Sequence, residues 1–291
     1  MKKCLKLALF ALLFPASAPL AADKSDVESA IDRRQELEWK SRDNPFAIIP
    51  HRPSYILPLT YIDKTNPEPY EGVDEDLVPS NNEVKYQFSF KVPLAKGLLY
   101  SNGYLSFGYT QQSFWQAYSS HSSSPFRETN YEPELLFTLP LEERALGFNW
   151  RLAVLSLNHQ SNGRTDPLSR SWNRVMLELV AEKNSLYLSL KPWWRVPEEE
   201  GDDDNPDIEE YLGNFELRLL KKHDNHTFGL MLRNNLDTDN NHGAGQFNYT
   251  FPINERLKGY AQFFSGYGES LIDYDHYNNR IGVGIMLTDW L

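Results

Sequence analysis

Apolar and polar residues alternate along most of this chain of 291 residues. In 83–93, every even-numbered residue from Val84 to Val92 is apolar, and the residues between them are polar. Successive side chains of a β-strand point to opposite faces, so this stretch predicts a strand with one apolar and one polar face. Further strands of this kind are predicted at 103–118, 131–139, 146–159, 172–182, 185–193, 210–220, 226–234, 244–252, 257–266 and 279–291.

A weaker first strand within 47–62, where Pro50, Pro53 and Pro58 disfavour regular pairing, brings the predicted number to twelve. Short links such as 182–185 alternate with longer loops such as 160–171. This alternation is typical of membrane barrels, whose closed sheet leaves no unpaired edge in hydrocarbon. We therefore predict an all-β fold, a twelve-stranded antiparallel transmembrane β-barrel of the outer membrane, formed by 46–291. A soluble two-sheet sandwich is the alternative.

The segment before the barrel is divided into two parts. Residues 1–22, MKKCLKLALFALLFPASAPLAA, have a basic start, an apolar core and a small-residue end, which predicts a secretory signal peptide. The only cysteine, Cys4, lies in it, so the mature chain would contain no disulfide. Residues 23–45 are polar with weak helical periodicity, and we expect a periplasmic segment with a short helix.

Charge and composition narrow the class of protein. The formal net charge of −11 becomes −14 when the three lysines of the signal peptide are removed, and so acidic a chain is not expected to bind nucleic acid. The content of 16 Tyr, 16 Phe and 7 Trp suits the aromatic girdles of a membrane barrel better than an ordinary soluble domain.

Three polar residues stand on positions that alternation assigns to the apolar face. His159 and Ser161 share the face of Leu157. In the next predicted strand, Asn173 shares the face of Val175, Leu177 and Leu179. If 147–159 and 172–182 pair as a hairpin, the three side chains gather at its loop end. They supply a nucleophile (Ser161), a general base (His159) and a group that orients the base (Asn173). A neutral amide suits a lipid-facing surface because a carboxylate would cost more to desolvate.

Gln111 is a fourth polar residue with outward parity, following Leu105, Phe107 and Tyr109. Polar side chains within a membrane usually find a partner, often across a subunit contact. The sequence therefore favours a dimer interface at Gln111, although a glutamine at headgroup level would simply be solvated.

Five segments resemble outer membrane phospholipase A, a bacterial outer-membrane phospholipase A1 family, and the similarity extends from about residue 45 to the C-terminus. The longest is NHQSNGRTDPLSRSWNR (158–174); the others are SSPFRETNYEPEL (123–135), YTQQSFWQ (109–116), DDNPDI (203–208) and SGYGESLIDY (265–274).

The resemblance implies a calcium-dependent hydrolase of phospholipid and lysophospholipid acyl esters at the A1 and A2 positions. It implies a Ser161–His159–Asn173 mechanism, with the backbone N–H of Gly163 in the oxyanion hole. It also implies a monomer at rest and an active homodimer with Gln111 at its interface. The substrate would be phospholipid in the outer leaflet, and the role would be in the lipid asymmetry and integrity of the outer membrane.

The resemblance further implies calcium ligands from both subunits. These are the carbonyl of Arg164, the hydroxyl of Ser169 and, from the partner subunit, Ser123; Asp166 is a possible ligand of the same loop. A weaker second site is implied near Asp203 and Asp204. A site with few carboxylates should bind Ca²⁺ weakly, and a ligand from a second chain would make binding depend on dimerisation.

Two other functions are compatible with the pattern. A barrel with an inactive His–Ser pair would be a small channel or structural protein, with Lys85, Gln87 and Lys91 lining its pore. A soluble secreted esterase is the third reading.

Overall fold

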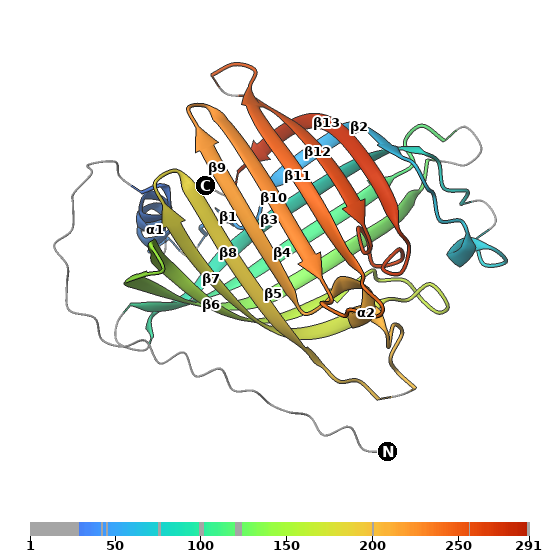
Figure 1. Cartoon of the computed structure of the whole chain (residues 1–291), viewed down its shortest axis with the longest axis horizontal. Helices are drawn as coiled ribbons and strands as arrows, with labels where there is room; N and C mark the ends of the chain where they lie inside the picture. Colours follow the sequence, from blue (N-terminus) through green and yellow to red (C-terminus); the bar gives the residue numbers. More distant parts are fainter. Residues whose placement is uncertain are drawn as a thin grey trace.

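The structure is a computed structural model. It describes residues 29–41, 43–44, 46–74, 77–98, 102–119, 124–199, 201–255 and 257–289. Most of the chain lies in long strands that form one barrel (Figure 1). The strands are β1 (Ile49–Pro50), β2 (Ser54–Ile62), β3 (Asn82–Leu98), β4 (Gly103–Trp115), β5 (Phe126–Ala145), β6 (Phe148–Ser161), β7 (Ser171–Lys183), β8 (Leu186–Val196), β9 (Phe215–His223), β10 (His226–Asn234), β11 (Gly243–Pro252), β12 (Lys258–Gly266) and β13 (Asn278–Thr288).

The sheet closes on itself. Each strand from β2 to β13 pairs antiparallel with its neighbours in sequence, β13 returns to pair with β2, and β3 pairs with both β2 and β4. The two-residue β1 is an addition that pairs with β3 and takes no part in the closure. The predicted twelve-stranded antiparallel barrel is therefore confirmed.

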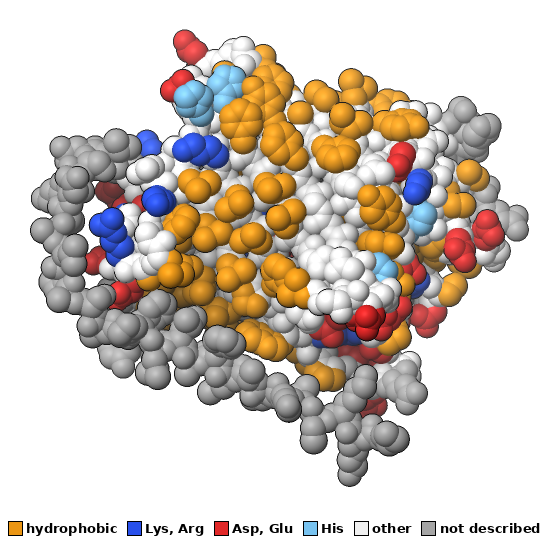
Figure 2. Space-filling model, in the orientation of Figure 1, with side chains coloured by type: hydrophobic (Ala, Val, Ile, Leu, Met, Phe, Trp, Pro, Cys, Tyr) orange, Lys and Arg blue, Asp and Glu red, His pale blue; other side chains and the backbone are white. Residues whose placement is uncertain are grey.

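The two faces of the barrel differ as alternation predicts. On β6, the outward Leu155 and Leu157 are 47% and 56% exposed, whereas the intervening Ser156 and the following Asn158 are buried inside. Figure 2 shows an apolar band over the outer surface, with most of the charged side chains gathered toward its ends. Such a band between charged rims is the surface that a barrel presents to a bilayer. The chain thus forms a membrane-spanning barrel.

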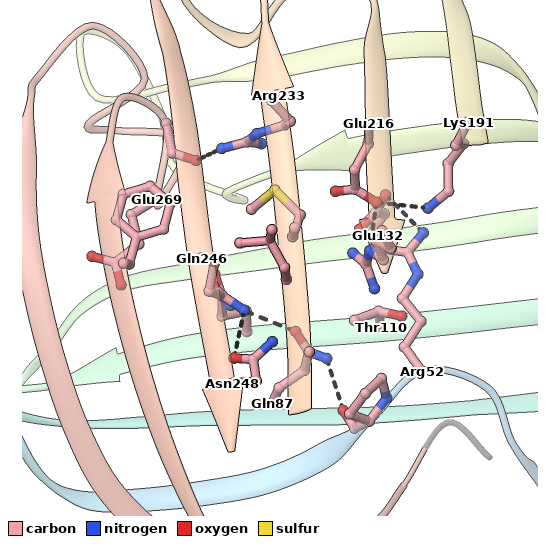
Figure 3. A pocket seen from close by; sticks show the side chains of 18 of the residues that line it. Arg52, Gln87, Thr110, Glu132, Lys191, Glu216, Arg233, Gln246, Asn248 and Glu269 are labelled. Carbon is pink, nitrogen blue, oxygen red and sulfur yellow. Dashed lines mark hydrogen bonds and ion pairs between the residues drawn. The ribbon is translucent and has the colours of Figure 1, made fainter. Parts of the chain in front are cut away.

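The interior is crossed by ion pairs rather than open. Arg52 bonds to Glu132, and Lys191 bonds to Glu216, across a polar cavity of about 210 Å³ (Figure 3). The candidate pore residues are engaged in the same way: Lys85 bonds to Glu269, Gln87 donates to the carbonyl of Pro53, and Lys91 bonds to Glu38.

Two helices lie at opposite ends of the barrel (Figure 1). Helix α1 (Ala30–Ser41), in the segment for which a short helix is expected, lies at the end with the short turns, where Ile31 packs on Val180 and Tyr187. Helix α2 (Ile208–Leu212) lies at the other end. Among the helices that the structure describes, none is long and apolar enough to cross a bilayer.

The prediction of a strand at 210–220 is wrong in its first part, because β9 begins only at Phe215. Ile208 and Leu212, four residues apart, are buried on one side of the single-turn α2, and Gly213 with φ 70° ends it. One helical turn is too short to give a periodic signal in the sequence.

A short 3₁₀ helix (Glu68–Tyr70) lies between β2 and β3. It carries Tyr70, which packs with Leu77, Leu168 and Ile272 at the same end of the barrel as α2. This apolar cluster anchors the loop that follows β6.

Candidate active site

Strands β6 and β7 pair in a register that sets His159 opposite Asn173, as the predicted hairpin requires. The ring Nδ1 of His159 lies 2.9 Å from Oδ1 of Asn173. Because an amide oxygen can only accept, Nδ1 carries the proton and the other ring nitrogen, Nε2, is left as an acceptor. Asn173 is held on its other side, since its Nδ2 donates to Oε1 of Glu198 at 3.0 Å.

Ser161 ends β6 on the same outward face, two residues after His159. It stands opposite Ser171 on one side and Tyr131 on the other. Among the contacts of the described residues, its hydroxyl makes no hydrogen bond to His159, so that contact stays a prediction. Nucleophile–base hydrogen bonds are often loose in a free enzyme and tighten with substrate.

On the lumen side of this site, buried polar side chains connect the neighbouring strands. Arg174, on the inner face of β7, donates to Oδ1 of Asn158 at 2.7 Å and to Glu132 at 3.1 Å. Its guanidinium also lies 4.0 Å from the ring centre of Trp172. These contacts join β5, β6 and β7, and they fix the register on which the His159–Asn173 pair depends.

The loop after Ser161 is organised by the buried side chain of Asn162. Its Oδ1 accepts the backbone N–H groups of Arg164 (3.2 Å) and Arg170 (3.0 Å), and its Nδ2 donates to the carbonyl of Leu168 at 2.8 Å. Gly163 follows with φ 65°, where an added Cβ would lie 3.1 Å from the ring of Tyr131. Glycine at this position allows the left-handed turn, which a side chain would strain.

Asn162→Ala should therefore destabilise this loop. The change leaves two backbone N–H groups and one carbonyl without their partner, and an unpaired buried group costs about 1–3 kcal/mol. We expect faster hydrogen exchange at Arg164 and Arg170, together with a drop in activity. Ser171→Ala, which changes a half-buried side chain one strand away, is the control. Unchanged exchange in the loop would contradict this role of Asn162.

The residues proposed as calcium ligands are partly brought together. The hydroxyl of Ser169 donates to Oδ2 of Asp204 at 2.6 Å, so the predicted first and second sites meet. Asp203 instead pairs with Arg195, which neutralises its charge. Asp166 lies exposed in the turn, and Ser123 lies outside the residues that the structure describes.

In the described part of the chain, no group of three or more His, Cys, Asp or Glu side chains could hold a metal. A calcium site here would consist mainly of neutral oxygens, namely the carbonyl of Arg164 and the hydroxyl of Ser169, with the carboxylate of Asp204. Calcium accepts such a donor set, and the single carboxylate fits weak binding.

Gln111 lies in the same row as the nucleophile. It stands opposite Tyr131 on β5, and Tyr131 stands opposite Ser161 on β6. Its amide is half-buried and bonds within its own strand, donating to Ser113 at 3.1 Å and accepting from Tyr109 at 3.1 Å. Gln111 on β4 and Ser161 on β6 are separated by two strand spacings of about 5 Å each. A second chain that contacts Gln111 would therefore lie about 10 Å from Ser161.

The sequence analysis missed three residues that shape the site: Asn162, Glu198 and Asn205. Asn205 is fully buried and its Oδ1 accepts the N–H of Ser171 at 2.9 Å, which joins the loop before α2 to the start of β7. Asn162 and Asn205 lie within the segments that carry the family resemblance, whereas Glu198 stands in an acidic run that predicts only a solvated loop.

Comparison with known proteins identifies the family. The profile described as phospholipase A1 matches residues 31–287. The phospholipase A1 of Escherichia coli (strain K12) is 38% identical over 253 residues, which cover 86% of this chain and 84% of the relative.

Two solved structures agree. An active-site mutant of outer membrane phospholipase A from Escherichia coli, with an asparagine replaced by alanine, has a TM-score of 0.80 and 38% identity, covering 86% of this chain and 95% of its own. The Salmonella typhi outer membrane phospholipase, a dimer with bound calcium, has a TM-score of 0.79 and 36% identity, covering 85% and 94%. This chain therefore belongs to the phospholipase A1 family and is an outer-membrane enzyme that hydrolyses phospholipid esters.

Proposed function

We propose that this chain is a calcium-dependent phospholipase A1/A2 that also accepts lysophospholipids and uses Ser161, His159 and Asn173. The observation that carries the proposal is the His159–Asn173 hydrogen bond on the lipid-facing wall, with Ser161 two residues away on the same face. The related Escherichia coli structure supports the role of Asn173, because its active-site mutant has an asparagine replaced by alanine.

In the proposed mechanism, Oγ of Ser161 attacks the ester carbonyl carbon while Nε2 of His159 takes the hydroxyl proton. Asn173 holds the ring in the tautomer that leaves Nε2 free to accept. The N–H of Gly163 donates to the oxygen that becomes negative. His159 then gives its proton to the leaving alcohol, and a water molecule activated by the same nitrogen releases the fatty acid from Ser161.

Calcium would be held by the carbonyl of Arg164, the hydroxyl of Ser169 and the carboxylate of Asp204, and a second copy would add Ser123. When bound, it would place positive charge near the developing oxyanion. Of the two acids in 203–204, Asp204 is preferred because Asp203 is already paired with Arg195. The Salmonella typhi relative, a dimer with bound calcium, supports calcium binding together with a dimer.

We further propose that the chain is a monomer at rest and an active homodimer with Gln111 at the interface. Gln111 shares its row with Ser161, so dimerisation would cover the apolar wall beside the nucleophile. Phospholipid would then reach Ser161 laterally from the outer leaflet, which links activity to loss of lipid asymmetry.

The assignment of the N-terminal segments is part of the same proposal. The signal peptide at 1–22 lies outside the residues that the structure describes. The polar segment at 23–45 would be periplasmic, because its helix α1 lies at the end with the short turns.

Fatty-acid release from phospholipid–detergent micelles tests this function. We expect release by the refolded protein with calcium and a large loss with chelator, whereas magnesium in place of calcium should not restore it. Sedimentation in the same detergent should show the dimer only with calcium. If the chelator does not change fatty-acid release, the serine-hydrolase mechanism would still hold, but the proposed calcium site would be wrong.

A further inference from the structure

Asn173 can serve His159 only in one orientation of its amide. Its oxygen accepts the proton of Nδ1, whereas its NH₂ group, turned to the same place, would oppose Nδ1–H and favour the other tautomer. That tautomer carries the proton on Nε2, which then cannot accept a proton from Ser161. Some neighbour is needed to keep the amide from turning.

Glu198 is placed to do this. Its Oε1 lies 3.0 Å from Nδ2 of Asn173, on the side away from His159. An ionised carboxylate only accepts hydrogen bonds, so it draws the NH₂ group toward itself and leaves the amide oxygen facing Nδ1.

The position of Glu198 follows from the strand register. Val196, at the end of β8, stands opposite Asn173, and Glu198 follows with the same parity, on the outward side. The rest of this loop is anchored: Ser171 donates its N–H to Asn205, and Ser169 donates to Asp204. Glu198 therefore lies beside Asn173 on a loop held at several points.

The charge of Glu198 is not taken up by a neighbouring cation. Arg195, on the adjoining strand, bonds to Asp203, and Arg174 points into the lumen and bonds to Glu132. Arg170, in the loop after β6, bonds to the carbonyls of Pro167 and Ser169. Among the described residues no Lys or Arg forms an ion pair with Glu198, so its contact with Asn173 is the one through which it acts.

We propose that Glu198 is a positioning residue that orients the amide of Asn173 and, through it, keeps His159 in the tautomer that leaves Nε2 free to accept a proton. The proposal rests on the proposed function, because it assumes that His159 is the base for Ser161. It extends the set of three residues to a chain of four, Ser161–His159–Asn173–Glu198, in which the charged member lies farthest from the lipid ester.

Glu198→Gln and Glu198→Ala should lower kcat about 10-fold, with KM nearly unchanged, the size of effect seen when an outer partner of a functional histidine is lost. The share of His159 rings that carry their proton on Nε2, measured by ¹⁵N NMR of the imidazole, should rise, because neither replacement fixes the NH₂ group of Asn173 on the far side from His159. Glu199→Gln, an exposed neighbour, is the matched control and should change neither kcat nor the tautomer share. Equal kcat values and equal tautomer shares for Glu198→Gln and Glu199→Gln would overturn the proposal.

A second pair of variants excludes a merely structural role. Asn173→Asp sets two carboxylates within hydrogen-bond distance, and like charges so close cannot both ionise without cost. Asn173→Asp should therefore be strongly impaired near pH 7. In Asn173→Asp/Glu198→Gln, the glutamine NH₂ can donate to the new carboxylate, and activity should return at least about 10-fold relative to Asn173→Asp. If the double variant is instead less active than Asn173→Asp, by the factor that Glu198→Gln alone costs, the proposal is wrong.

The tautomer of His159, measured by ¹⁵N NMR of its ring, separates this proposal from the proposed function. The share with the proton on Nε2 should rise in Glu198→Gln, whether or not the protein hydrolyses lipid. A changed tautomer share in a protein whose activity does not need Ser161 would contradict the proposed function but support the Glu198–Asn173 contact. An unchanged tautomer share in an enzyme that needs Ser161 would contradict the positioning role alone.

Discussion

Ser161→Ala is expected to abolish fatty-acid release while leaving the barrel folded. The substitution removes the attacking oxygen, and loss of a member of such a triad typically lowers kcat by about 10⁴-fold or more. The hydroxyl makes no hydrogen bond within the described residues, so its removal should not disturb β6. Fatty acid released from micelles with calcium measures the first effect, and heat-dependent mobility in gel electrophoresis measures the second.

The matched control is Ser171→Ala, because Ser171 stands opposite Ser161 on β7 and changes by the same atom. It should keep nearly full activity. A serine-directed organophosphorus reagent should label the wild-type protein at Ser161 and fail to label Ser161→Ala. Substantial release by Ser161→Ala would mean that another group attacks the ester, and the assignment of the nucleophile would be wrong.

The barrel could be predicted from the sequence because its signal is local. A strand that separates lipid from lumen needs a period of two, and this period is plain from Val84 to Val92 and on β6 and β7. The hairpin of His159 and Asn173 could be predicted for the same reason, since a one-residue slip would turn every side chain to the wrong face.

The rest of the site depends on contacts between loops distant in sequence. Glu198 meets Asn173 only because β8 returns beside β7, and Ser169 meets Asp204 across 35 positions. Neither contact produces a periodic pattern in the sequence from which it could be predicted. Helix α2 was not predicted because one turn gives no period. The loop at 160–171 was predicted, but the hydrogen bonds of Asn162 within it were not, because such contacts leave no periodic pattern in the sequence. The motif segments indicated where the chemistry lies, and the tertiary fold decides which partners each residue has.

Arg280→Met, at the outer end of the barrel, should strongly lower the free energy of unfolding. Arg280 is 2% exposed; its Nε donates to Glu269 at 2.8 Å and its guanidinium also bonds to Glu83 at 2.6 Å. Removing one partner of a buried ion pair costs about 3–5 kcal/mol, because the other charge stays buried. We expect the low end, about 3 kcal/mol, since Lys85 still pairs with Glu269 and Arg127 with Glu83.

The pH dependence of this loss identifies its cause. Burial by itself would raise the pKa of Glu269, but the charges of Arg280 and Lys85 outweigh it and lower the pKa from 4.5 to about 2. In the wild type, the stabilisation from the ionised carboxylate is therefore complete above about pH 4.5 and is lost as the pH falls toward 2. In Arg280→Met, Glu269 can take up a proton at higher pH, so the loss in unfolding free energy should shrink between pH 7 and pH 4.

Guanidinium unfolding in detergent, followed by Trp fluorescence at several pH values, measures this difference. Lys40→Ala, which breaks an exposed pair with Glu36 on α1, is the control and should leave the unfolding midpoint unchanged. A loss for Arg280→Met that stays constant from pH 7 to pH 4 would contradict this cause. It would assign the effect to packing against Phe114, over whose ring Arg280 lies, and not to the lost ion pairs with Glu269 and Glu83.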